Sequence, residues 1–448
     1  MDSGVNIDRG IDPGSLGRRA SLAIAILMSF RTFQYFPGMQ YLQELWYVLC
    51  LVALGIVYPV WKYATRSRFT SFEIYVLVLT VVAIVLPAWA ARREFGQPLI
   101  YGLLAQRSAV LMVIPLLLLL GMRTRRISPY DIELALIWLA WGTFALYSLM
   151  LLFLNPENFV SYGVGFAQDV NGTVRFVQNS DFLVFALIYY TLLGFRKRRA
   201  KYYAAAAIFL IAVTDNANGR AFMVSLAATF LYFLYRWRPI GQFLGTIGKT
   251  CCVAVIMIGL GYAIDAEYVS TRAASFADAF KVAFTGSEAA DASATIRIFE
   301  TLTAWPYIQQ NPLLGNGTLS HQWEGGDEGV LGVYFYASDI GIIGVVFAVG
   351  VFGLLLFVYQ FQFAISAARK LKQRVRGPLA DAAVGFLLCS ALNSIATGIF
   401  FFAPEVMLVF IALVVALTSP GASGHRSASP YGRLSYAPGT IPGIPTSS

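Results

Sequence analysis

Residues 341–366 read GIIGVVFAVGVFGLLLFVYQFQFAIS, and no charged side chain interrupts them. A helix needs about 20 apolar residues to cross a bilayer, so this stretch is long enough to span one. The rest of the chain has the same character, because 58% of its 448 residues are hydrophobic and 13% are charged. Soluble domains carry about 25% charged residues. This composition excludes a disordered chain, a coiled coil and an ordinary water-soluble enzyme.

Long apolar runs recur along the whole chain, and they are continuous rather than alternating, which argues against a β-barrel. The sequence therefore predicts an all-α polytopic membrane protein with about 12 transmembrane helices. Arg31 interrupts the first expected span and Pro37 ends it, so this span could lie in the membrane interface instead. The expected spans cover residues 20–36, 44–61, 71–91, 99–120, 130–154, 180–195, 201–214, 219–236, 250–264, 341–366, 380–400 and 404–418.

Basic residues alternate between the two sides of these spans. Of the 33 lysines and arginines, 24 fall in the terminal tails or in every second loop. The positive-inside rule places such loops, and both termini, in the cytoplasm. Residues 1–19 and 419–448 are then cytoplasmic tails, and the second is expected to be disordered because it is rich in glycine, proline and serine. The same alternation explains the net charge of +9 without a nucleic-acid partner.

One long hydrophilic segment, residues 265–340, is expected on the outer face. From residue 265 to residue 329 it holds nine acidic and three basic side chains, a net charge of −6 in a protein of total charge +9. Within it, residues 293–310 have apolar side chains at helical spacing and predict an amphipathic helix. The stretch from residue 330 is apolar and returns the chain to the membrane. A second polar loop is expected on the same face at residues 155–179.

No cofactor or metal site is predicted. The four cysteines, Cys50, Cys251, Cys252 and Cys389, all lie in apolar runs, and none forms a C-x-x-C pair. Cysteines of this kind act as small hydrophobic residues in helix packing. Neither a disulfide framework nor a zinc site is therefore expected.

Five short motifs stand at the expected outer face. TDNANGRAF (214–222) lies at the mouth of a span, and SATIRIFETLTAWPYIQQ (293–310) is the expected loop helix. NPLLGNG (311–317) follows, with a helix-breaking Asn-Pro and two glycines that let the backbone approach a ligand closely. HQWEGGDEG (321–329) and DIGIIG (339–344) complete the set. The order of TDNANGRAF, the loop helix, NPLLGNG and the apolar stretch that ends in DIGIIG resembles the O-antigen polymerase and O-antigen ligase superfamily of membrane glycosyltransferases.

The resemblance covers residues 200–350 by motif and the remainder by topology alone. It implies a bacterial inner-membrane enzyme, with its active site facing the periplasm, that transfers a glycan from undecaprenyl diphosphate to a sugar hydroxyl. It implies neither a metal nor a nucleotide sugar. The implied partners are the lipid-linked donor and acceptor, membrane lipids, and a chain-length regulator or a flippase. The resemblance also assigns Arg220 and Arg297 to the diphosphate of the lipid carrier.

The chemistry of such a reaction independently favours arginine. Negative charge grows on the departing diphosphate as the glycosidic bond breaks, and a guanidinium can stabilise it through two parallel hydrogen bonds. Arg107, within a span, and Arg272, in the outer loop, are further candidates for the diphosphate site. Two structural alternatives stay open, because Arg297 could pair with Glu300 on the same turn and Arg220 could pair with Asp215 at the mouth of the span.

An acceptor hydroxyl also needs a base or a strong hydrogen-bond acceptor. Ligases of the superfamily carry a histidine at a fixed distance before a G-x-x-G motif. With Gly341 as the first glycine, that position holds Val330, so a polymerase is favoured; a register that begins at Gly332 would suit a histidine but lacks the second glycine. The candidate bases are the acids and the histidine after the loop helix, each of which could instead only solubilise the loop: Glu328, Asp327, His321 and Glu324.

The leading prediction is a polysaccharide polymerase that extends a glycan on undecaprenyl diphosphate. The alternatives are an O-antigen ligase with lipid A–core as the acceptor, and a polytopic transporter or flippase. Transporters usually have polar or broken helices at the midplane, and most spans here lack polar residues. Trp305, Tyr307 and Trp323 lie near the charged groups, and their rings suit either sugar stacking or the interfacial aromatic belt.

Overall fold

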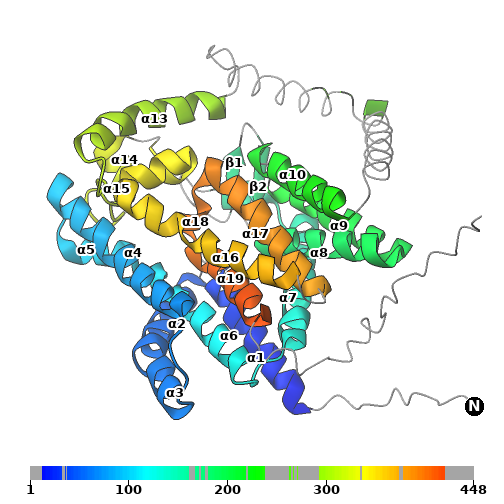
Figure 1. Ribbon diagram of the computed structural model, residues 1–448. Coiled ribbons are helices and arrows are strands. Elements are labelled where there is room, and N and C mark those ends of the chain that lie inside the picture. Colours follow the sequence, from blue (N-terminus) through cyan, green and yellow to red (C-terminus); the bar gives the residue numbers. More distant parts are fainter. Residues whose placement is uncertain are drawn as a thin grey trace, which may run out of the picture.

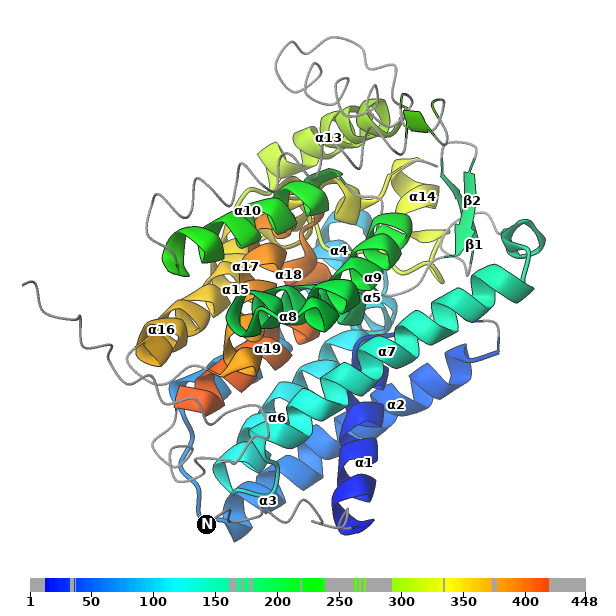
Figure 2. The same ribbon diagram turned by 90° about the vertical axis from the view of Figure 1, so that its right-hand side faces the viewer.

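The computed structural model consists mainly of helices packed side by side (Figures 1 and 2). It describes residues 13–32, 36, 38–160, 167–170, 173–176, 180–217, 220–237, 262, 263, 266, 270, 292–332, 335–372 and 377–418. The expected span 250–264 lies almost wholly outside these residues, and so do the tails 1–12 and 419–448 and the outer loop before residue 292.

The helices are labelled here as in Figure 1. In the first half of the chain they are α1 (Pro13–Ser29), α2 (Gln40–Val52), α3 (Tyr58–Ala64), α4 (Ser71–Phe95), α5 (Leu99–Ala105), α6 (Val113–Arg123), α7 (Pro129–Phe153), α8 (Asp181–Lys197), α9 (Ala200–Ala217) and α10 (Arg220–Trp237). In the second half they are α13 (Ala292–Gln310), α14 (Gly326–Leu331), α15 (Ile342–Val358), α16 (Gln360–Lys372), α17 (Pro378–Thr397), α18 (Ile399–Phe402) and α19 (Pro404–Thr418).

Several of these helices are long and apolar enough to cross a membrane, and five pass this test singly. They are Gln40–Ala64, Ser71–Phe95, Pro129–Phe153, Ile342–Leu371 and Pro378–Thr397. Leu99–Ala105 and Arg107–Arg123 add a sixth if they form one span, with a bend of 47° between them. Shorter apolar helices are Ala200–Thr214, Ala221–Arg236 and Pro404–Thr418. The chain thus has the character of a helical membrane protein, and the count of about 12 spans stays a prediction.

The last helix, α19, lies in the interior of the bundle. Residues on every face of it are buried, as expected for a helix that is apolar all round. The ring of Phe410 lies 4.1 Å from that of Phe386, 5.4 Å from that of Phe185 and 6.3 Å from that of Phe30, measured between centroids. The final helix therefore joins α1, α8 and α17 into one core.

The connection between α7 and α8 contains a short antiparallel hairpin of β1 (Ala167–Val170) and β2 (Thr173–Phe176). The sequence predicts only a polar loop here, so the strands are a finding of the structure. Phe176 and Ala167 are fully buried and pack with Tyr147 and Met150 of α7, which attaches the hairpin to the helices. Apart from this hairpin, the regular secondary structure among the described residues is helical.

Candidate functional site

The expected loop helix is present as α13, which lies across one end of the bundle, whereas α1 begins and α3 ends at the opposite end (Figures 1 and 2). We call the end that carries α13 the outer end. The 3-10 turn η4 (Ala337–Ile340) packs against α13, α15 and α17. Helix α14 lies close by (Figure 1), so the motifs around residues 297, 327 and 339 meet at this end.

The NPLLGNG loop inserts into a break in helix α15. Gly350 has φ 64° and ψ −174°, which interrupts the helical path. The loop backbone takes up the hydrogen-bonding groups that the break exposes. Asn316 N–H donates to Phe347 O (2.7 Å), Gly317 N–H to Ala348 O (2.9 Å), Val351 N–H to Pro312 O (2.9 Å) and Phe352 N–H to Leu313 O (3.1 Å). The loop therefore completes the hydrogen bonding of α15.

The glycines of this loop are required by close contact with helices. A Cβ atom on Gly315 would lie 2.5 Å from the backbone nitrogen of Gly350, and one on Gly317 would collide with the backbone of α4 at Pro87 and Ala91. From the sequence, these glycines are expected to let the backbone approach a ligand closely. In the structure the chain that approaches them is the protein itself.

Polar side chains of α4 and of the residues after it hold the other side of the loop. Arg93 Nη2 donates to Gly315 O at 3.0 Å, and Ser320 N–H donates to Gln97 Oε1 at 2.7 Å. Gln106, at the bend between α5 and α6, hydrogen-bonds the hydroxyl of Thr318. The loop thereby places the segment that begins at residue 321 at the outer end.

Four carboxyl groups form what we call the outer acid cluster: Glu300, Asp327, Glu328 and Asp339. Glu300, on the inner face of α13, is completely buried and accepts a hydrogen bond from Tyr336 N–H at 3.0 Å. Burial raises the pKa of Glu300 to about 7, although the Tyr336 hydrogen bond and the charge of Arg297 oppose the rise. Glu300 Oε2 is buried without a hydrogen-bond partner among the described residues.

Asp327, at the start of α14, is the second perturbed acid. Burial raises its pKa to about 7, and a hydrogen bond from the Leu319 backbone and the charge of His321 oppose this rise. Its Oδ1 atom is buried and has no hydrogen-bond partner in the described part of the chain. A carboxyl group with a pKa near neutrality can accept a proton at physiological pH, which is what a general base must do.

Tyr336 connects the two halves of the outer acid cluster. Its hydroxyl hydrogen-bonds the carboxylate of Glu328, while its backbone N–H binds Glu300. Burial and the contact with Glu328 raise the pKa of Tyr336 to about 12, so the hydroxyl stays protonated at neutral pH. Burial also raises the pKa of Asp339, and the charge of Arg297 opposes that shift.

Arg297 is the cation next to these acids. It is exposed on α13, and no ion pair closer than 4 Å among the described residues includes it. Its positive charge nevertheless acts to lower the pKa of both Glu300 and Asp339. The alternative of a direct pair with Glu300 is thus not what the structure shows, because one side chain faces the solvent and the other is buried.

The packing of α10 against α17 determines where Arg220 lies along the axis of the bundle. Thr229 of α10 lies beside Cys389 of α17, and Phe233, one turn further along α10, lies against Gly385, one turn earlier in α17. The two helices are therefore antiparallel with a defined register. Equal numbers of residues along two helices cover equal lengths, so this register can be extended to the helix ends.

Arg220 is the first residue of α10. Counting back from Thr229 to Arg220 takes as many residues as counting forward from Cys389 to Gly398, which places Arg220 level with Gly398. A Cβ atom on Gly398 would lie 3.0 Å from the carbonyl oxygen of Gly341, directly after η4. The backbone of Arg220 is therefore at the level of the outer acid cluster. Its side chain lies outside the described part of the structure.

The remaining candidates for the diphosphate site are placed differently. Arg107 binds Glu44 of α2, with Nε 2.8 Å and Nη2 2.5 Å from the carboxylate oxygens, and its guanidinium lies over the ring of Tyr47. Its charge is thus already balanced, as for a structural ion pair. Arg272 lies outside the described residues.

The aromatic candidates divide into two groups. Tyr307 packs against Phe95 and Phe347, with ring centroids 5.6 and 6.0 Å away, so its ring contributes to the support of α13. Trp305 is half exposed on α13, and Trp323 is partly exposed. Only the two tryptophans offer substantial ring surface for stacking on a sugar.

His321 and Glu324 are exposed, and Glu324 has a left-handed φ of 49°. Glu300, Tyr336 and Asp339 are site residues that the sequence alone did not predict. Asp339 could have been found from its position at the start of DIGIIG, but the burial of Glu300 has no local signal. In the described part of the chain, no three or more His, Cys, Asp or Glu residues gather in a way that could hold a metal ion.

No protein-family model matches the chain, and neither does any curated protein sequence. Function is therefore inferred from the motifs and from the geometry of the outer end.

Proposed function

We propose that this protein is a polysaccharide polymerase that transfers a glycan from undecaprenyl diphosphate to a sugar hydroxyl of another lipid-linked repeat unit. The observation that carries the proposal is the placement of Arg297, without a carboxylate within 4 Å among the described residues, beside an acid cluster in which Glu300 and Asp327 have pKa values of about 7. An anion-binding group and a base are what the transfer needs.

In the proposed step, the acceptor oxygen forms a bond to the anomeric carbon and the bond from that carbon to the diphosphate oxygen breaks. The electron pair of the broken bond leaves with undecaprenyl diphosphate, and the hydroxyl proton passes to a carboxylate. We assign Asp327 as this base, because its pKa is about 7 and its Oδ1 has no hydrogen-bond partner among the described residues. Glu328 is instead bound to the Tyr336 hydroxyl, and with it positions the acceptor.

The leaving diphosphate is assigned to Arg297 and Arg220. Arg297 lies on α13, and the register of α10 against α17 brings the backbone of Arg220 to the same level of the molecule. Two guanidinium groups can accommodate charge on several phosphate oxygens through charge-assisted hydrogen bonds. Because that charge grows as the bond breaks, the arginines act mainly on turnover.

The reaction is tested by deleting the gene and separating the cell's polysaccharide on a gel. A polymerase deletion leaves single repeat units on their final acceptor. Long chains that stay on the lipid carrier would identify a ligase, and a loss of repeat units from the outer face would identify a flippase. Purified protein given only lipid-linked repeat units should produce a ladder of longer glycans.

Two variants test the site within that assay. Arg297→Lys keeps the charge but loses the parallel N–H donors of the planar guanidinium. We expect at least about a tenfold fall in turnover, which equals a rise of about 1.4 kcal/mol in the activation free energy. Arg92→Lys, at an exposed position near the end of α4, is the matched control and should be near normal. Asp327→Asn should lower turnover strongly, and the residual activity should no longer rise with pH near 7 as it does in the wild type. Normal activity in both site variants would refute the assignment.

The broken helix α15 is the observation that most favours a transporter, because transporters bind ions and substrates at discontinuous helices. In this chain the break is filled by the NPLLGNG loop through four backbone hydrogen bonds. Those backbone groups are therefore already occupied within the protein. This occupancy supports the enzyme over the transporter.

A further inference from the structure

A second polar site lies at the end of the bundle opposite α13, where α3 ends. A hollow of about 600 Å³ lies there, a volume typical of ligand pockets. Apolar side chains of Pro59, Tyr63 and Phe69 form part of its wall, and Lys62, Arg66 and Ser67 form the polar part. Nothing in the proposed transfer reaction uses this site.

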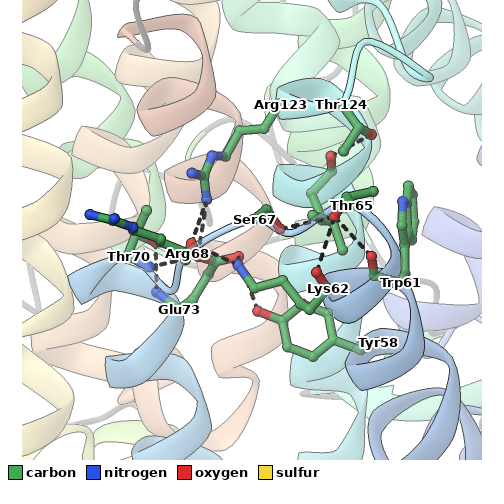
Figure 3. A network of polar contacts seen from close by, with 11 residues as sticks. Tyr58, Trp61, Lys62, Thr65, Ser67, Arg68, Thr70, Glu73, Arg123 and Thr124 are labelled. Atoms are coloured by element: carbon green, nitrogen blue, oxygen red, sulfur yellow. Dashed lines mark hydrogen bonds and ion pairs between the residues drawn. The ribbon is translucent and has the colours of Figure 1, made fainter.

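Glu73, the carboxylate that pairs with Lys62 at this site, is fully buried and already bound. Lys62 Nζ lies 2.9 Å from Oε1, and Arg123 Nη1 lies 3.2 Å from Oε2. Thr70 N–H donates to Oε2 at 2.7 Å, and the Tyr58 hydroxyl donates to Oε1 at 3.0 Å. Figure 3 shows these groups converging on Glu73 from α3, α4 and α6. Glu73 therefore has no capacity left to neutralise other cations.

Arg66 lines the hollow, and three more arginines lie in the turns that follow α3 and α6; all four are exposed: Arg66, Arg68, Arg125 and Arg126. None of them is in an ion pair closer than 4 Å within the described residues. They belong to one surface, because Lys62 Nζ and Arg123 Nη1 both donate to Arg68 O, and the Arg126 guanidinium lies 5.5 Å from the Trp61 ring centroid. The surface thus carries a concentrated excess of positive charge.

Two of these arginines occupy backbone positions that favour glycine. Arg66 has φ 48° and Arg125 has φ 59°, both in the left-handed region. Ser67 N–H bonds Lys62 O at 3.3 Å and Arg126 N–H bonds Gly121 O at 2.9 Å, which is the Schellman pattern of a helix end. A side chain at such a position strains the backbone, so glycine would suit the fold better.

We propose that this hollow, with Arg66 at its rim, binds the phosphate headgroup of an anionic phospholipid. The exposed guanidiniums complement the phosphates, and the wall formed by Pro59, Tyr63 and Phe69 suits the upper part of an acyl chain. Basic pockets between membrane helices bind cardiolipin-type headgroups in this way. The basic turns mark this end as the side that faces the anionic cytoplasmic leaflet.

The test uses the purified full-length protein in neutral detergent and follows its thermal unfolding by tryptophan fluorescence. Cardiolipin should raise the Tm by several degrees more than the same amount of phosphatidylcholine does. Arg66→Gly should lose at least half of that difference in Tm. Its Tm in phosphatidylcholine should be unchanged or higher, because glycine removes the backbone strain of the left-handed conformation. Arg66→Lys should retain most of the difference.

Arg198→Gly is the matched control. Arg198 is exposed, has φ 52° and caps the end of α8, so the change removes the same charge from the same backbone conformation away from the hollow. Its cardiolipin response should equal that of the wild type. An equal loss in Arg66→Gly and Arg198→Gly would reduce the effect to diffuse surface charge and overturn the proposal. An equal rise in Tm with inorganic phosphate would overturn it as well, because the ligand would then not be a lipid.

Discussion

Replacing Glu300 by glutamine tests whether a buried carboxyl group on α13 holds the outer acid cluster together. The side chain is completely buried, Oε1 accepts a hydrogen bond from Tyr336 N–H, and Oε2 has no partner among the described residues. Glutamine has the same shape and keeps the acceptor, but it cannot ionise. The substitution therefore removes the charge and leaves the packing of η4 against α13 in place.

The magnitude follows from the pKa of Glu300, which burial raises from 4.5 to about 7. A carboxyl group that binds its proton more tightly when folded stabilises the fold below pH 4.5, and the stability falls as the pH rises to about 7. The difference between these pKa values corresponds to about 3 kcal/mol of unfolding free energy. The glutamine variant loses none of this, so its advantage over the wild type should grow as the pH rises from 4.5 to about 7 and should be complete above neutrality.

The assay is thermal unfolding in neutral detergent at pH 5 and at pH 8. We expect Glu300→Gln to lie close to the wild type at pH 5 and to have a Tm several degrees higher at pH 8. Glu324→Gln removes the same charge from an exposed side chain and should show no such dependence on pH. A Glu300→Gln variant with the same pH dependence as the wild type would refute the reasoning, because Glu300 would then ionise freely in the folded protein.

Three further predictions concern the helix break, metals and topology. Gly350→Ala should lower the Tm markedly, because the position has φ 64° and a Cβ atom would collide with the backbone of Leu313, whereas Gly142→Ala in α7 has open space around it and should be neutral or stabilising. Glycan transfer should persist in excess chelator, since arginine can assist diphosphate departure; activity lost to chelation and restored by magnesium would count against the proposed chemistry. A tag at residue 198 should report the cytoplasm and one at residue 288 the periplasm, and a cytoplasmic result at residue 288 would overturn the site.

Local features of the sequence predicted the helices well. The apolar run of 341–366 and the helical spacing of 293–310 both correspond to helices, and α13 ends at Gln310, directly before the Asn-Pro pair. These features act within a few residues, through side-chain periodicity and the restriction that proline places on the residue before it. They also indicated a membrane protein, because composition alone sets how much apolar surface the chain carries.

The candidate site was predicted only in part. His321, Asp327 and Glu328 were selected for their residue types, but their burial and partners could not be read from the chain. Arg297 and Glu300 share one helical turn, yet one is exposed and the other is buried. The difference arises because α15 and η4, both some distance along the chain, pack against the apolar side of α13.

Tertiary structure decided the roles that depend on distant segments. NPLLGNG was predicted to be a tight loop, but only packing shows that it completes the hydrogen bonds of α15 around Gly350. Arg107 was expected to be available to a ligand, and α2 supplies Glu44 as its partner. The positions and lengths of the helices follow from interactions between residues that are neighbours in the sequence. The protonation of Glu300 and the choice of which cations stay unpaired follow from what the fold places beside each group, because burial and charge act through space.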